Sequence, residues 1–186
     1  KIEHHAILHT GEYLEKRGYE VTYLDVDENG IVSPEAVEAA IRPDTILISV
    51  MFANNEIGTI EPIKEIGEIA HKHGILFHTD AVQAVGNIKI DVKEMGIDLL
   101  SMSAHKFYGP KGVGALYVRD GIDFIQLQNG GHQENDKRAG TENVAGIVGL
   151  GKAIEIANDN VMHNNGKLLN LRNYCIEPVS YTHLRA

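Results

Sequence analysis

The sequence predicts an α/β domain in which helices flank a mostly parallel sheet. Two observations support this prediction: short apolar runs alternate with amphipathic helical patterns, and several of the runs end in polar residues. Alternating strands and helices are typical of βαβ units, in which a helix joins consecutive parallel strands. Hydrophobic residues make up 43% of the chain and charged residues 23%, which indicates a globular rather than a disordered protein.

The helices are predicted from the signals at their ends. A helical pattern over residues 5–17 ends at Gly18, and glycine tolerates the left-handed conformation that often closes a helix. Ser33 offers an N-cap hydroxyl, and Pro34 suits the first helical position of the next helix. We expect helices at residues 5–17, 34–41 and 62–73 and over much of 144–158.

The strands are predicted from apolar runs that lie between turn signals. Residues 45–51 form a nearly continuous apolar run, which is typical of a strand buried on both faces. The DENG sequence at 27–30 predicts a turn. The other predicted strands cover residues 20–24, 75–79, 97–102 and 113–119.

Charge and composition exclude several classes of protein. Lys and Arg number 17 against 26 Asp and Glu, a net charge of −9, so we expect no nucleic-acid partner and no membrane. The single cysteine excludes a disulfide framework and a cysteine-based zinc site. Most of the ten histidines are interpreted as surface or core residues, so no metal is expected. The chain begins at Lys1 without a signal-like segment, and we interpret it as a fragment.

Polar residues follow the carboxyl ends of predicted strands, where α/β sheets bind ligands. Asp80 ends one strand, and a buried carboxylate there needs a cation or hydrogen-bond donors; a protonated pyridine nitrogen is such a cation. Lys106 follows another strand, and a lysine with a lowered pKa is a nucleophile toward aldehydes. Each residue also has a plainer interpretation, Asp80 as an N-cap and Lys106 as a solvated lysine. Together they favour pyridoxal chemistry.

Five sequence features make the chain resemble the cysteine desulfurases of the NifS/IscS type. They are His4, NNEIG at 54–58, HTDAVQ at 78–83, SAHKFYGPKGVGALYVR at 103–119 and KRAGTENV at 137–144. These enzymes are class-V aminotransferases of PLP fold type I, where PLP is pyridoxal 5′-phosphate. The resemblance implies that residues 1–177 are the central part of the large PLP-binding domain. Residues 178–186 no longer follow the family pattern and are interpreted as a separate tail.

The resemblance also implies roles for individual residues. Lys106 is expected to form the Schiff base with PLP, Asp80 to keep the pyridine nitrogen protonated, and His4 to stack on the ring and transfer protons. The remaining expected contacts are Asn55 and Gln83 with the phenolic oxygen, Ser103 and His105 with the phosphate, and Thr141 with the phosphate of the neighbouring subunit in a homodimer.

The function implied by the resemblance is cytoplasmic desulfuration of L-cysteine. The products would be alanine and an enzyme persulfide, passed to a sulfur-acceptor scaffold protein for iron–sulfur cluster assembly. The family's catalytic-cysteine segment has no counterpart here, because Cys175 lies in a helical pattern, where a small apolar residue is the simpler interpretation. We therefore expect this chain alone to be inactive. The alternatives are a related PLP lyase, such as a selenocysteine lyase or a sulfinate desulfinase, and a non-catalytic PLP-binding remnant.

Overall fold

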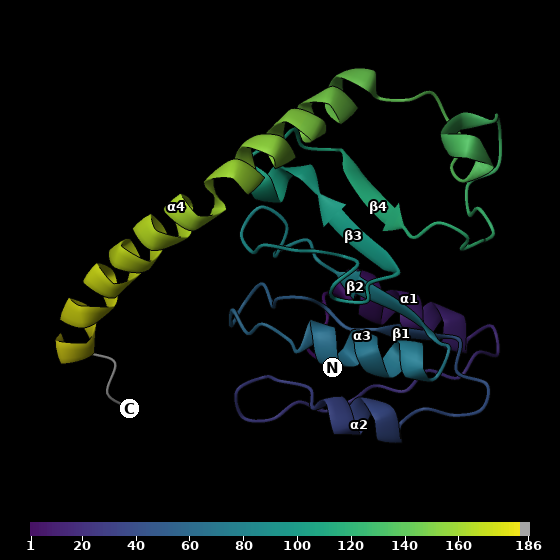
Figure 1. Ribbon diagram of the computed structural model, residues 1–186, viewed down its shortest axis with the longest axis horizontal. Coiled ribbons are helices and arrows are strands. Elements are labelled where there is room, and N and C mark those ends of the chain that lie inside the picture. Colours follow the sequence, from purple (N-terminus) through teal and green to yellow (C-terminus); the bar gives the residue numbers. More distant parts are fainter. Residues whose placement is uncertain (183–186) are drawn as a thin grey trace.

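The computed structural model describes residues 1–182, with side chains described for residues 1–177. Within this range a four-stranded sheet has the strand order β1-β2-β3-β4 (Figure 1). Strands β1 (Leu47–Ser49), β2 (Leu76–Asp80) and β3 (Leu99–Ser103) are parallel, and β4 (Gly114–Val118) runs antiparallel to β3. The expected α/β class with a mostly parallel sheet is confirmed.

The strand register brings the polar strand ends to one edge. Ser49 pairs with His78, and Asp80 pairs with Ser101. Beyond β1 the chain stays extended, and the backbone N–H of Phe52 donates to the backbone oxygen of Asp80 at 2.9 Å. Because β1, β2 and β3 are parallel, the segments that follow them leave the sheet at the same carboxyl edge.

The predicted helix-end signals are confirmed by capping contacts. The Ser33 hydroxyl accepts the N–H of Ala36 at 3.0 Å, and Gly18 has the left-handed φ of 91°. The Ser33 bond and the Gly18 conformation depend only on residues close in the chain, which is why the sequence could reveal them. The α-helices are α1 (His5–Glu15), α2 (Pro34–Ala39), α3 (Ile63–Lys72) and α4 (Val144–Thr182), and two short 3₁₀ turns are η1 (Ala104–Phe107) and η2 (Gln133–Asp136).

Helix α3 covers one face of the sheet with an apolar stripe. Ile63 and Ile66 are buried, whereas Ile69 is only half-buried. Gly67 allows a close approach, because an added Cβ there would lie 2.3 Å from the backbone oxygen of Met95. The core between helix and sheet also contains the fully buried Phe77.

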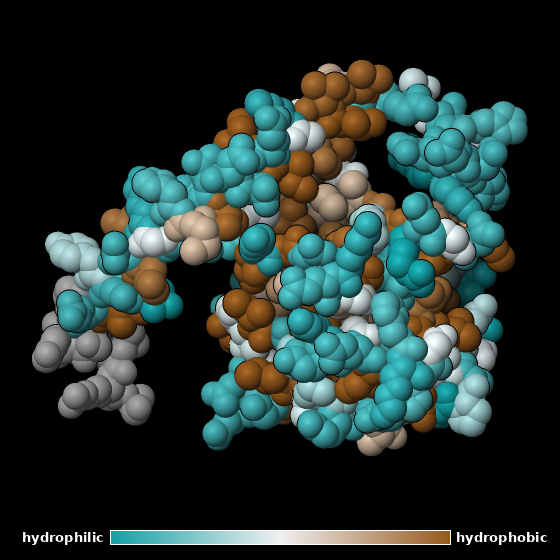
Figure 2. Space-filling view, viewed as in Figure 1, coloured by the Kyte–Doolittle hydropathy of each residue, from teal (hydrophilic) through white to brown (hydrophobic). Residues whose placement is uncertain are grey.

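Helix α4 is far longer than the helix predicted over 144–158 and extends away from the sheet (Figure 1). Ala157 is buried, and an added Cβ at Gly86 would lie 3.0 Å from the Ala157 Cβ, so this part of α4 packs against the domain. Apolar residues gather on the surface at the start of α4 (Figure 2), where Val144 and Val148 are each 66% exposed. Among the described helices, none has both the length and the hydropathy needed to cross a membrane.

The strand predicted at residues 20–24 is wrong. Within residues 1–182 this segment belongs to no strand, although the Lys1 amino group donates to the Leu24 oxygen at 2.9 Å. A strand requires a ladder with a neighbour, and an apolar run alone does not supply one. The strand predicted at 45–51 is shortened to the three residues of β1 for a related reason: only the segment in ladder register with β2 is assigned.

Candidate active site

The carboxylate of Asp80 closes β2 at the carboxyl edge of the sheet and is only 7% exposed. Its Oδ1 accepts the N–H of Val82 at 3.0 Å, so the side chain also caps the following turn. No ion pair between described residues includes Asp80. A buried carboxylate without a cation is unfavourable, and the protonated nitrogen of a pyridine ring would supply the missing charge. Asp80 therefore fits the expected cofactor.

The predicted phosphate ligands lie where β3 passes into η1. Ser103 Oγ and His105 Nδ1 are 2.8 Å apart and share a hydrogen bond. Lys106 follows within η1, and its side chain is exposed at this edge. The structure thus places a hydroxyl, an imidazole and an amine together, which is a donor set suited to a phosphate and an aldehyde.

A strained turn fixes the position of η1. Tyr108 has φ of 65° and ψ of 15°, the left-handed conformation that non-glycine residues rarely adopt. The N–H of Gly109 donates to the Ala104 oxygen at 2.8 Å and closes the turn. An added Cβ at Gly109 would lie 2.9 Å from the Ala104 Cβ. Strain of this kind is typical of functional sites and here lies two residues after Lys106.

Two hydrogen bonds made by the His78 side chain cross the sheet, two residues before Asp80 on β2. The Nδ1 of His78 lies 2.8 Å from Ser49 Oγ, and its Nε2 lies 2.9 Å from Ser101 Oγ. Burial lowers the pKa of His78, and the nearby Asp80 charge partly opposes this effect. By residue type alone, His78 is predicted only as a surface or core histidine. The available signal was its spacing, because residues 78 and 80 of one strand share a face.

The two asparagines that follow β1 differ in their surroundings. Asn54 is buried, and its Oδ1 accepts the N–H groups of Glu56 and Ile57 at 2.8 and 3.0 Å. Asn54 therefore shapes the turn. Asn55, the predicted contact of the phenolic oxygen, is exposed on the same turn.

His4 forms the N-cap of α1. Its Nδ1 accepts the N–H of Ala6 at 3.1 Å, and the ring is exposed. Because Nδ1 must be unprotonated to accept this hydrogen bond, the proton of the neutral ring is on Nε2. His4 therefore has its Nδ1 fixed by the helix, and its Nε2 carries the ring proton and can donate a hydrogen bond.

The remaining predicted residues lie on different segments. Gln83 is half-buried in the turn after β2. Thr141 is exposed in the segment between η2 and α4. Among the described contacts, none joins Thr141 to Asp80 or Lys106 within this chain.

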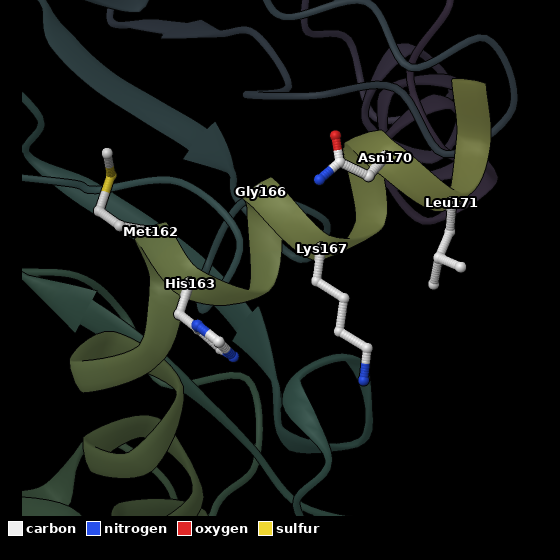
Figure 3. Close-up of a pocket in the computed structure, with 6 residues that line it drawn as sticks. All are labelled: Met162, His163, Gly166, Lys167, Asn170 and Leu171. Atoms are coloured by element: carbon white, nitrogen blue, oxygen red, sulfur yellow. The ribbon is translucent and has the colours of Figure 1, made fainter. Parts of the chain in front are cut away.

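A hollow of about 550 Å³ lies away from this edge, and all its described lining residues belong to α4. Figure 3 shows that the labelled side chains, among them Met162 and Lys167, point to different sides of the helix. Binding sites need polar groups that converge on one position. We therefore do not assign a site to this hollow.

Comparisons with known proteins find similar sequences and similar solved structures. The family profile of the class-V aminotransferases matches residues 1–177. The chain is 66% identical over 179 residues to "Cysteine desulfurase IscS" of Clostridium botulinum, which covers 96% of this chain and 45% of that protein. It resembles a solved NifS-like protein with a TM-score of 0.93 and 42% identity, covering 97% of this chain and 50% of the other.

A second solved structure, described as SspA in complex with cysteine, gives a TM-score of 0.81 at 51% identity. The similarity covers 83% of this chain and 45% of SspA. The chain thus spans about half the length of the curated relatives and solved structures that it matches.

Proposed function

Because the chain belongs to the class-V aminotransferase family, we propose that it forms the central part of the large domain of a PLP-dependent cysteine desulfurase. The observation that supports this most directly is the buried, cation-free Asp80 at the same sheet edge as Lys106. In this proposal residues 1–177 are the partial PLP-binding domain, and residues 178–186 are a tail outside the family pattern.

Four sets of residues would hold the cofactor. The Lys106 amine would bond the aldehyde carbon, and Ser103 and His105 would bind the phosphate. The Asp80 carboxylate would hold a proton on the ring nitrogen by Coulomb attraction, which is strong where water is excluded. Asn55 and Gln83 would bind the phenolic oxygen. PLP, when bound, supplies the electron sink that makes the substrate's α-proton acidic.

His4 would act at the face of the ring. While its Nδ1 accepts the Ala6 N–H, Nε2 holds the ring proton, so taking the substrate's proton at Nε2 requires the ring proton to move to Nδ1 and the Ala6 contact to open. A histidine is suited to this role because its ordinary pKa lies near neutral pH. We propose that Nε2 carries the proton that is exchanged with the substrate.

The proposed substrate is L-cysteine, in keeping with the relatives named cysteine desulfurases and with the cysteine bound to SspA. In the balanced reaction, the C–S bond breaks, a cysteine thiol of the enzyme takes the sulfur as a persulfide, and the carbon skeleton leaves as alanine. A scaffold protein for iron–sulfur clusters would accept the sulfur in the cytoplasm. Cys175 is exposed on α4, and we do not assign it the nucleophile's role.

The test uses a protein of the relatives' full length that carries residues 1–177 of this chain. Purified with PLP, it should convert L-cysteine to alanine and release sulfide in the presence of a reductant. The Lys106→Ala variant should not. Faster turnover of selenocysteine or cysteine sulfinate than of L-cysteine would contradict the proposal in favour of a related lyase. Absence of any PLP absorbance would contradict the cofactor assignment.

A further inference from the structure

The carboxyl group of Glu3 makes an unusual contact for a residue outside the predicted site. Its Oε1 accepts the backbone N–H of Met51 at 2.5 Å, although the two residues are 48 positions apart. Its Oε2 is buried and has no hydrogen-bond partner among the described residues. A buried polar atom without a partner is unfavourable, so such a group calls for an explanation.

A second hydrogen bond ties the same segment to the same loop. The Asn54 side-chain nitrogen donates to the backbone oxygen of Ile2 at 2.8 Å. Residues 2 and 3 are therefore held at two points to the segment that follows β1. His4 comes next and caps α1. The two ties thus lie directly before the residue proposed to face the cofactor.

The point at which Glu3 binds is part of the sheet edge that carries Asp80. Met51 is 2% exposed and lies between two residues in register with β2. On one side, Val50 donates its N–H to the His78 oxygen at 3.2 Å, and on the other, Phe52 donates to the Asp80 oxygen at 2.9 Å. Because Met51 lies between these two residues, a shift of Glu3 would displace the Met51 backbone and, through it, the hydrogen bonds of Val50 and Phe52 to β2.

We propose that Glu3 is a positioning residue, whose carboxyl group, together with Asn54, locks the segment before His4 to the end of β1 and so sets His4 against the edge that carries Asp80. The inference rests on the proposed function only for the role of His4. The lock consists of the Glu3–Met51 and Asn54–Ile2 hydrogen bonds, and both lie within this chain.

The protonation of Glu3 should control the lock. Burial, helped by the charges of Asp80 and Glu61, raises the pKa of Glu3 to about 7. The Met51 N–H and the N-terminal amino group act in the opposite direction. Below pH 7 the neutral carboxyl group places no negative charge beside these two acids. Above pH 7 the carboxylate is repelled, and the lock should weaken.

Two variants of the full-length protein test the role, with Glu12→Gln on the exposed face of α1 as the matched control. Glu3→Ala removes the acceptor for Met51 and should lower kcat roughly 10- to 100-fold, with the KM for L-cysteine within about twofold, because misplacement affects chemistry more than binding. Glu3→Gln keeps an acceptor without a charge and should restore kcat. An equal loss of activity in both variants, or normal kcat in Glu3→Ala, would overturn the proposal.

Measurements on the same proteins without PLP keep this test separate from the proposed function. Hydrogen exchange of the Met51 amide should be at least about tenfold faster in Glu3→Ala than in Glu3→Gln, since the amide loses its acceptor. The ¹³C signal of the labelled Glu3 carboxyl group should titrate well above the ordinary value of 4.5, since the longer protein lacks the Lys1 amino charge that lowers the pKa of Glu3 here. A midpoint near the ordinary value of 4.5, or equal exchange in both variants, would overturn the lock. If the exchange and the titration both give the expected results but desulfurase activity is absent, the proposed function fails and the lock stands.

Discussion

The hydroxyl of Ser103 and the Nδ1 of His105 lie 2.8 Å apart at the end of β3. This hydrogen bond orients both groups beside Lys106, the next residue of η1. A phosphate bound there would meet two hydrogen-bonding groups that are already held in place, and such preorganisation reduces the entropy lost on binding. This edge of the sheet can be tested in a protein of the relatives' full length that carries residues 1–177.

The first prediction concerns Lys106. Borohydride reduction of the holoenzyme should attach the cofactor irreversibly to the peptide that contains Lys106, and peptide mapping by mass spectrometry would show it. Lys106→Ala should abolish both the attachment and turnover, because no other amine lies on η1. Lys111→Ala, a change to an exposed lysine nearby, is the control and should retain both. Attachment to Lys111 would contradict the assignment.

The second prediction concerns the charge of Asp80. Asp80→Asn should still bind PLP but should reduce kcat by roughly two or more orders of magnitude, comparable with the loss of one preorganised electrostatic contact. The amide preserves the shape and can still accept the Val82 N–H, but it offers no negative charge to a protonated ring nitrogen. Steady-state kinetics and the cofactor's absorbance would check this. Near-normal kcat would remove Asp80 from the proposed role.

The third prediction is that Thr141 completes the site of the neighbouring subunit. The protein should be a dimer by light scattering. Mixing Lys106→Ala subunits with Thr141→Ala subunits should give activity above that of either parent, up to about a quarter of the unmodified value. Statistical exchange makes about half of the dimers mixed, and each mixed dimer has one complete site. A strictly monomeric active protein, or no gain on mixing, would contradict shared sites.

The fourth prediction concerns pH and His78. Burial lowers the pKa of His78, so the folded protein resists a proton that the unfolded chain accepts below about pH 6.5. The free energy of unfolding should therefore fall as pH drops through this range. His78→Gln should reduce the fall, whereas the exposed His163→Gln should not, as measured by urea unfolding at pH 8 and pH 5.5.

Glu3 acts on stability with the opposite sign. Its raised pKa favours the folded state at low pH, and that contribution is lost as pH rises through about 7. The comparison at His78 must therefore keep Glu3 unchanged. An identical pH response in His78→Gln and the unmodified protein would show that the imidazole is not shielded from protonation.

Local signals in the sequence predicted most of the helices because their causes are local. The Ser33 cap and the Gly18 end depend on contacts within three or four residues. The strand at 20–24 failed because pairing depends on a distant segment. The structure joins the helix predicted over 144–158 and the helical pattern around Cys175 into the single helix α4, a continuity that local signals at the helix ends do not reveal.

The class of fold and the chemical groups available follow from the amino-acid sequence, since Asp80 and Lys106 are recognisable from their residue types and the strand ends they follow. Which distant groups meet depends on the folded domain. The Ser49–His78 bond joins residues 29 positions apart, and the Glu3–Met51 bond spans 48. Both depend on strand register and on the placement of α1, which arise from packing of the whole domain and leave no local pattern in the chain.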